Sequence, residues 1–361
     1  MSLLPGCDAS VLDAWFARDY TGAHRNFAEA CDHAGITRRF VQHPGTGPAG
    51  EPVGISVARL GPLCADRILV ILSGVHGPEL MCGSAIQTGL LQTGMLGALS
   101  PDTAVLMVHA VNPWGAAYAS RTNEDNIDLC RNFVDFNAPL PVNAGYRAIA
   151  RAFHSQAEDG DALLAEFARQ HGTLALNTAM WGGQYEEPSG FSFGGHAPAW
   201  SRLVLESVLR EHVGSAQRIV VVDCHSGVGP YGYGLAVCMQ AGTALERVRK
   251  MFGHWVLAPR EAGAGDYYPV TGHASDGYES WFEGRELSAI VLEFGTYDLQ
   301  HTSGVMRAEQ RLRHHGDSIR APEAIRHDVV EAYCPADPAW RYAVWTRALQ
   351  VVEQSIAGLH T

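Results

Sequence analysis

The sequence lacks the features that would point to nucleic acid, a membrane or export. Its net charge is −12 over 361 residues and it has no block of like charges, whereas a surface that binds phosphate or anionic lipid needs a basic stripe. No run approaches the ~20 apolar residues of a membrane span, and Asp8 and Asp13 interrupt the stretch where a signal peptide would be apolar. We therefore expect a cytoplasmic protein with neither a membrane nor a nucleic-acid partner, and leave a homo-oligomer open.

Closely spaced cysteine pairs, internal repeats and low-complexity linkers are missing too. The eight cysteines show no CxxC spacing, and several lie in apolar segments. This pattern predicts reduced, mostly buried thiols. Because no linker divides the chain, we expect a single domain over residues 1–361, although its length would allow two.

What the sequence does contain is short apolar runs separated by longer amphipathic segments. The runs predict buried strands at 67–73, 103–113, 218–227 and 287–297. Helices are predicted at 9–34, at 78–92 with Pro78 in its first position, and at 144–170, 199–213 and 340–359. Loops are predicted at 44–52 and at 173–198, the second rich in glycine and aromatic residues. The alternation predicts an α/β fold of three layers, α/β/α, around a mixed, largely parallel sheet.

Three of the predicted strands carry polar side chains near their carboxyl ends, where open α/β sheets bind ligands. His76 and Glu79 follow the first run, His225 lies near the end of the third, and Glu293 near the end of the fourth. Two imidazoles and a carboxylate are a ligand set of catalytic zinc, and a further carboxylate could act as base. The plain alternatives are a chance HxxE spacing and a hydrogen-bonded histidine, but the glycine-flanked bend around His76 favours a metal.

Six motifs in a fixed order resemble the M14 zinc carboxypeptidases, and more closely their bacterial branch DUF2817. The motifs are specific as a set, although each alone is weak. They are GVHGPE (74–79), VNPWG (111–115), RTNEDNIDLCRNF (121–133), GQYEEPSGFSFGG (183–195), DCHSGVGPYG (223–232) and LEFGTY (292–297). The resemblance implies a zinc carboxypeptidase-like (phosphorylase/hydrolase-like) fold with its catalytic core at roughly 60–310, on which segment 1–45 and helix 340–359 pack.

The resemblance also implies the roles of the polar residues. By position, it makes His76, Glu79 and His225 the ligands of one Zn²⁺, and Glu293 the general base and acid. Asp128 matches the carboxylate that orients the first histidine. Without the resemblance, Asp128 could equally be a helix cap or a turn aspartate.

Two arginines match residues that act on substrate. Arg121 corresponds to the arginine that polarises the scissile carbonyl and stabilises the oxyanion; without the resemblance it would read as a solvated surface residue. Arg131 corresponds to the arginine that grips the substrate's terminal carboxylate. The family has asparagine before this arginine, whereas this chain has Cys130, and a thiol is a poor hydrogen-bond donor. We therefore expect intact zinc chemistry, but not the usual carboxypeptidase binding of the substrate's terminal carboxylate.

The remaining substrate contacts are predicted from loops. The tyrosine that closes over substrate matches Tyr268 on a loose alignment, with Tyr267 and Tyr278 as competitors. Gln184 and Tyr185 lie in the long aromatic loop, which we place at the rim of the pocket in contact with substrate.

The predicted function is that of a hydrolase of the metallopeptidase or metallocarboxypeptidase-like class. It would cleave a peptide or amide bond next to a carboxylate-bearing group, in a peptide or a small molecule, with zinc-activated water and a glutamate base. One alternative is an N-acyl amino-acid deacylase similar to aspartoacylase and succinylglutamate desuccinylase. Another is a non-catalytic metal-binding protein of the same fold.

Overall fold

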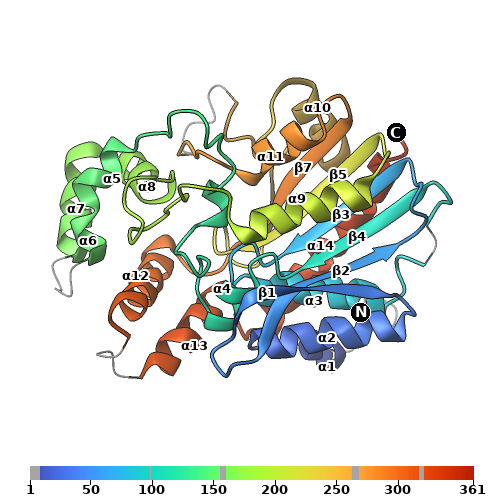
Figure 1. The fold of residues 1–361 in the computed structure, drawn as a ribbon, viewed down its shortest axis with the longest axis horizontal. Coiled ribbons are helices and arrows are strands. Elements are labelled where there is room, and N and C mark those ends of the chain that lie inside the picture. The colour runs from blue at the N-terminus through green and yellow to red at the C-terminus, as the bar shows by residue number, and fades with distance from the viewer. Residues whose placement is uncertain (1–8, 98, 155–159, 262–267, 317–320) are drawn as a thin grey trace.

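A computed structural model describes residues 9–97, 99–154, 160–261, 268–316 and 321–361. Its centre is a seven-stranded sheet in the order β1-β2-β4-β3-β5-β7-β6 (Figure 1). The strands are β1 Arg38–Thr46, β2 Pro52–Leu60, β3 Arg67–Ser73, β4 Thr103–His109, β5 Arg218–Ser226, β6 Gly234–Val237 and β7 Glu286–Phe294. The four central strands, β4, β3, β5 and β7, run parallel, and the outer strands pair antiparallel. The predicted α/β fold with a mixed sheet is confirmed.

The four predicted strands are the four parallel ones, because strands buried on both faces form continuous apolar runs. Strands β1, β2 and β6 were not predicted. β1 is an edge strand that alternates irregularly between exposed and half-buried positions, so it carries no clear pattern. The predicted loop at 44–52 is accordingly wrong at both ends, since β1 continues to Thr46 and β2 begins at Pro52.

Helices cover both faces of the sheet and complete three layers. The first face carries α1 Ala9–Trp15, α2 Tyr20–His33, α3 Leu80–Gln92, α10 Gly242–Phe252 and α14 Pro338–Gly358, and the second carries α9 Trp200–Val213 and α11 Ala274–Trp281. Alternate residues of β3 point to opposite faces: Leu69 and Ile71 enter one hydrophobic core, and Ile68 and Val70 enter the other. No described helix is both long and apolar enough to span a membrane.

Several further helices gather at one end of the sheet (Figure 1). They are α5 Ala144–Ile149, α6 Arg151–His154, α7 Gly160–His171, α8 Thr173–Trp181, α12 Leu299–His315 and α13 Pro322–Tyr333, while α4 Pro113–Tyr118 follows β4. The single helix predicted at 144–170 is divided among α5, α6 and α7. The loop predicted at 173–198 is wrong for α8, whose sequence TLALNTAMW has no glycine or proline and several good helix formers.

The cysteines agree with the prediction of buried thiols. Seven lie within the described residues and none of these forms a disulfide; six are buried and Cys64 is exposed. Cys7 lies outside the described residues.

The order of the strands places a crevice at the carboxyl ends of β3 and β5. From β3 the chain moves to β4 on one side, and the next parallel strand, β5, lies on the other side. Ligand crevices form at such switch points. The bend after β3 packs closely on α4, since a Cβ at Gly77 would lie 2.1 Å from the carbonyl carbon of Gly115. Only glycine permits this approach, which brings His76 to the crevice.

His109, at the end of β4, generates a prediction about stability and pH. It is fully buried, its Nε2 lies 2.9 Å from Ser84 Oγ, and its ring stacks on Phe27. Burial first, and His24 second, lower the pKa of His109 to about 3. On acidification, His109 therefore takes up a proton near its ordinary pKa of ~6.5 in the unfolded chain but stays neutral in the native state. The free energy of unfolding falls as the pH drops from ~6.5 toward the native pKa of about 3.

Between about pH 7 and pH 5, the wild type should lose about 2 kcal/mol of unfolding free energy more than His109→Phe does. Urea unfolding at several pH values measures this difference. His33→Gln, which removes an exposed histidine without touching the core, is the control. Parallel pH curves for the wild type and His109→Phe would contradict the assignment.

Candidate metal and catalytic centre

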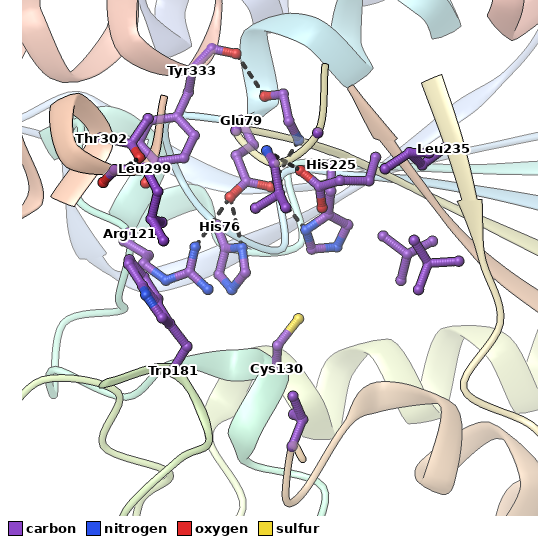
Figure 2. Close-up of a pocket in the computed structure, with 18 of the residues that line it drawn as sticks. His76, Glu79, Arg121, Cys130, Trp181, His225, Leu235, Leu299, Thr302 and Tyr333 are labelled. Atoms are coloured by element: carbon purple, nitrogen blue, oxygen red, sulfur yellow. Dashed lines mark hydrogen bonds and ion pairs between the residues drawn. The ribbon is translucent and has the colours of Figure 1, made fainter. Parts of the chain in front are cut away.

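A cavity of about 470 Å³ lies at this crevice (Figure 2). Its floor is polar, and its wall along β6 and β7 is apolar, with Leu235, Val237 and Val291. Helices α8, α12 and α13 contribute Trp181, Thr302 and other residues, so this group of helices bounds the cavity opposite the sheet. The polar floor contains the residues predicted as metal ligands.

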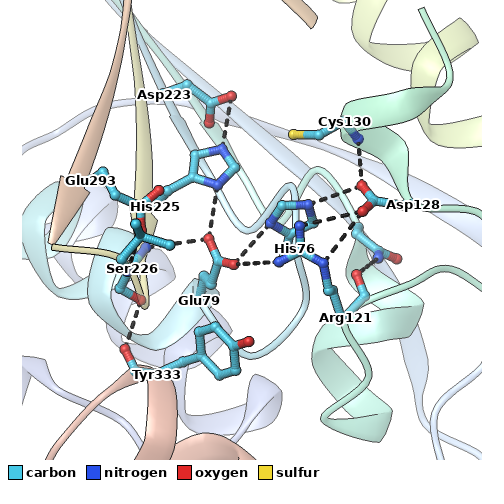
Figure 3. Close-up of polar contacts among 12 residues, drawn as sticks. His76, Glu79, Arg121, Asp128, Cys130, Asp223, His225, Ser226, Glu293 and Tyr333 are labelled. Atoms are coloured by element: carbon cyan, nitrogen blue, oxygen red, sulfur yellow. Dashed lines mark hydrogen bonds and ion pairs between the residues drawn. The ribbon is translucent and has the colours of Figure 1, made fainter. Parts of the chain in front are cut away.

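His76 and Glu79 reach the floor from the turn between β3 and α3. The helix begins at Leu80, two residues after the predicted start, and Glu79 is its N-cap residue in a helical conformation. Glu79 follows His76 by three positions in this turn, so the two side chains face each other, and His76 Nδ1 lies 2.8 Å from Glu79 Oε1 (Figure 3). Both side chains are buried.

His225 approaches the same carboxylate from the end of β5. Its Nδ1 lies 2.8 Å from Glu79 Oε2, and the amide of Ser226 donates to that oxygen at 3.2 Å. The two imidazole rings stand edge to face, 5.0 Å apart. The two histidines therefore each direct one nitrogen at a different oxygen of Glu79.

The opposite nitrogens of both rings face buried aspartates. His76 Nε2 lies 3.1 Å from Asp128 Oδ1, and His225 Nε2 lies 3.1 Å from Asp223 Oδ2. A carboxylate in this place fixes the tautomer and orientation of a metal-binding histidine. The resemblance pointed to Asp128, whereas the partner role of Asp223 was missed. Its spacing was a usable signal, since residues two apart on a strand share a face.

The donor chemistry of this floor fits a divalent cation. Burial raises the pKa of Glu79, but His76 and His225 outweigh burial and hold that pKa well below its usual range. Burial and Arg121 lower the pKa of His76, but Glu79 and other anionic groups raise it overall to about 10. Anionic groups raise the pKa values of both imidazoles, and the same negative charge favours a bound divalent cation.

Cys130 adds a third donor to the two histidines. The donor atoms of His76, Cys130 and His225 all lie within 4.8 Å of one another. Burial raises the pKa of the Cys130 thiol, but His76 and His225 outweigh burial and lower it to about 7. From the sequence, Cys130 was interpreted as the loss of the asparagine amide that the family has at this position. That its sulfur lies near the two histidines was not predicted.

Arg121 lies beside the same carboxylates and lines the cavity. It donates to Glu79 Oε1 and to Asp128 Oδ2, each at 3.3 Å, and its guanidinium lies 5.4 Å from the centre of the Trp181 ring. Burial would lower the pKa of Arg121, but the two carboxylates more than offset this and raise it. The side chain is therefore a fixed positive charge at the floor.

Glu293 lies on β7 directly beside His225 in the sheet register. Its Oε1 accepts a hydrogen bond from the amide of Val228 at 3.1 Å, and its side chain lines the cavity. Burial first, and Glu79 second, raise the pKa of Glu293. The site thus holds two carboxyl groups whose pKa values are shifted in opposite directions, lowered for Glu79 and raised for Glu293.

Arg131 also lines the cavity, but most of its hydrogen-bonding capacity is used within the protein. Its Nε and Nη2 donate to the carbonyl of Trp181 at 2.9 and 2.5 Å, and its Nη1 donates to the carbonyl of Cys130 at 2.8 Å. Three of its five N–H groups are therefore occupied. The position of its charge is fixed by the surrounding backbone.

Of the three tyrosine candidates, Tyr268 lines the cavity. Tyr278 is buried in the core against Phe133 and Trp281, and Tyr267 lies outside the described residues. Tyr333, from α13, also lines the cavity and was not predicted. No local pattern in the sequence linked Tyr333 to a site formed at strand ends.

Gln184 and Tyr185 are not among the residues that line the cavity, and their contact with substrate stays a prediction. The amide of Gln184 bonds the backbone of its own loop at Glu187 and Phe191. The hydroxyl of Tyr185 donates to the carbonyl of Arg131 at 2.6 Å. Both side chains are buried and hold the loop and the turn at Arg131 in place.

Comparison with known proteins assigns the family. The chain belongs to DUF2817, described as a protein of unknown function, whose model matches residues 16–347. No curated protein matches the chain in sequence.

Three solved structures show distant likenesses. Carboxypeptidase A from Helicoverpa armigera is 13% identical, with 98% of this chain and 76% of that chain covered and a TM-score of 0.46. An aspartoacylase family protein from Mesorhizobium loti is 12% identical, with 78% and 67% covered and a TM-score of 0.37. Glutaminyl cyclase from Tannerella forsythia is 14% identical, with 95% of both chains covered and a TM-score of 0.37.

The two histidine–aspartate pairs generate a prediction about metal affinity. Asp128→Asn and Asp223→Asn should each weaken zinc binding about 10- to 100-fold. The carboxylate accepts a hydrogen bond from the histidine ring and carries a negative charge, whereas the amide that replaces it is neutral. Competition with a chromophoric chelator measures the affinity. Asp125→Asn, at an exposed position of the same loop as Asp128, is the matched control. Equal zinc affinity in the wild type and both buried variants would rule out this role.

Proposed function

We propose that this protein is a zinc-dependent hydrolase that cleaves a peptide or amide bond next to a carboxylate-bearing group. One observation carries the proposal: Glu293 lies in the same cavity as His76, Glu79 and His225, with a raised proton affinity. A metal site that only stabilises structure has no use for such a carboxyl group. A hydrolytic site needs one.

When bound, the zinc ion supplies a Lewis acid that polarises a carbonyl and lowers the pKa of water. Glu293 takes a proton from the attacking water and returns it to the leaving amine. A raised pKa suits both steps, since a group that titrates nearer neutral pH can accept and then donate a proton. The backbone amide of Val228 fixes the orientation of its carboxylate.

Arg121 is the group that stabilises the negative charge of the tetrahedral intermediate. It is positively charged, held by two carboxylates and adjacent to the proposed ligand Glu79. A charge fixed before the reaction begins needs little reorganisation when the oxyanion forms. The same contacts explain why it lies at the floor instead of in solvent.

Arg131 is the anchor for the substrate carboxylate. Two of its N–H groups remain after the three backbone bonds, and a planar guanidinium suits a planar anion. Tyr268 lines the cavity with Arg131 and is the tyrosine we assign to close over substrate. The apolar wall of β6 and β7 fits an apolar group on the substrate.

An N-acyl amino-acid deacylase is the second candidate, and the extent of the cavity favours it. Helices α8, α12 and α13 bound the cavity on the side away from the sheet, and its volume of about 470 Å³ lies in the range of small-molecule sites. A short acylated amino acid fits this space without an extended groove. The chemistry of the residues is the same in both candidates.

The role of Glu293 is tested by Glu293→Gln. This variant should bind zinc at one equivalent and keep the thermal stability of the wild type, while turnover falls below detection, because an amide cannot accept the proton. Metal analysis and a chelator-sensitive hydrolysis assay are the measurements. Full activity in Glu293→Gln would contradict the mechanism. A zinc-loaded wild type that hydrolyses neither peptides nor N-acyl amino acids would contradict the proposed function itself.

The role of Arg131 is tested by paired substrates that end in a free carboxylate or in its amide. The free acid should be cleaved about 10- to 100-fold more efficiently in kcat/KM, the value of one or two charged hydrogen bonds. Substrates with an apolar residue at this end should be preferred to acidic ones. Arg131→Ala should erase the difference between acid and amide, and equal cleavage of the two by the wild type would count against the anchor.

A further inference from the structure

We propose that Cys130 is a fourth protein ligand of the metal and closes the site in the resting protein. The inference rests on the proposed function because both require a metal ion at His76, Glu79 and His225. It goes beyond that function by assigning Cys130 to the coordination position of the metal at which water would otherwise be activated. Figure 2 shows the sulfur pointing toward the rings of His76 and His225.

The distances suit a ligand. Around a tetrahedral zinc ion with Zn–S of ~2.3 Å and Zn–N of ~2.0 Å, sulfur and nitrogen lie about 3.6 Å apart. One ligand atom each from His76, Cys130 and His225 lies within 4.8 Å of the other two, a group that does not include Glu79. A contraction of about an ångström around an ion therefore brings all three donors into contact with it.

One carboxylate fixes both Cys130 and its histidine neighbour. The amide of Cys130 donates to Asp128 Oδ1 at 3.0 Å, and the same oxygen lies 3.1 Å from His76 Nε2. Asp128 is also the N-cap residue of η1 Leu129–Arg131, the short helix that carries Cys130. The position of the sulfur is thus tied to the position of the first imidazole.

The other side of this short helix is held by the long aromatic loop and the segment before α11. The hydroxyl of Tyr185 donates to the carbonyl of Arg131. Gly272 has a φ of +67°, and a Cβ there would lie 2.3 Å from the same carbonyl oxygen. The backbone around Cys130 is enclosed on both sides, so the sulfur leaves the cluster only by rotation of its own side chain.

The chemistry of the surroundings favours a thiolate on the metal. Zinc binds thiolate readily, and sites closed by four protein ligands hold no water, whereas catalytic sites keep one position open. The guanidinium groups of Arg121 and Arg131 line the same cavity as Cys130 and stabilise a further negative charge. Hydrolysis then requires the thiolate to leave the metal, so that the closed site is a resting form.

Substitution of the metal by Co²⁺ tests the proposal without an activity assay. Cobalt should give its visible d–d bands in the wild type together with a thiolate-to-cobalt charge-transfer band in the near ultraviolet. The charge-transfer band should be lost in Cys130→Ser while the d–d bands remain. Cys64→Ser, at the exposed cysteine, should retain both.

Ethanethiol added to the cobalt proteins distinguishes a closed site from an open one. It should restore a charge-transfer band in Cys130→Ala, which also shows that this variant is folded and loaded, and should leave the wild-type spectrum unchanged. Cobalt bound to the wild type without a charge-transfer band would overturn the role of Cys130 alone. Failure of the wild type to bind cobalt or zinc would overturn both this inference and the proposed function.

Discussion

The carboxylate of Glu79 is the contact on which the site depends. Its two oxygens face the Nδ1 atoms of His76, from the turn after β3, and His225, from the end of β5. A buried carboxylate in this place is tolerable only because positive charge surrounds it. Arg121 balances the charge of Glu79, and burial together with Glu79 raises the pKa of Glu293. The aspartates behind each histidine stabilise positive charge at the rings that face Glu79.

The fold supplies this convergence through the order of its strands. β3 and β5 are neighbours, and the chain leaves β3 toward the opposite side of the sheet before it returns through β5. The bend after β3 and the end of β5 therefore open into one crevice. Helices from two distant parts of the chain, α8 and α12–α13, then bound this crevice. Rigid elements position the ionisable groups, and the loop around Tyr185 holds the turn that carries Cys130 and Arg131.

The parts that the sequence predicted well are those governed by local pattern. The parallel strands are buried on both faces, so their apolar runs were visible, and the polar residues near their ends were placed together by the rule for α/β sheets. Edge strand β1 and helix α8 lacked comparably clear patterns. Asp223 could have been paired with His225 from its spacing alone. The direction of the Cys130, Gln184 and Tyr185 side chains could not be predicted, because it depends on the packing of distant loops.

The most direct test of a metal at this floor is a crystal structure of the zinc-loaded protein, with diffraction data collected on both sides of the zinc absorption edge. One strong anomalous peak is expected, present only above the edge, within bonding distance of Nδ1 of His76, Nδ1 of His225 and the carboxylate of Glu79. A zinc-loaded crystal with no peak among these three residues, or with its only peak elsewhere, would show that they do not hold the metal.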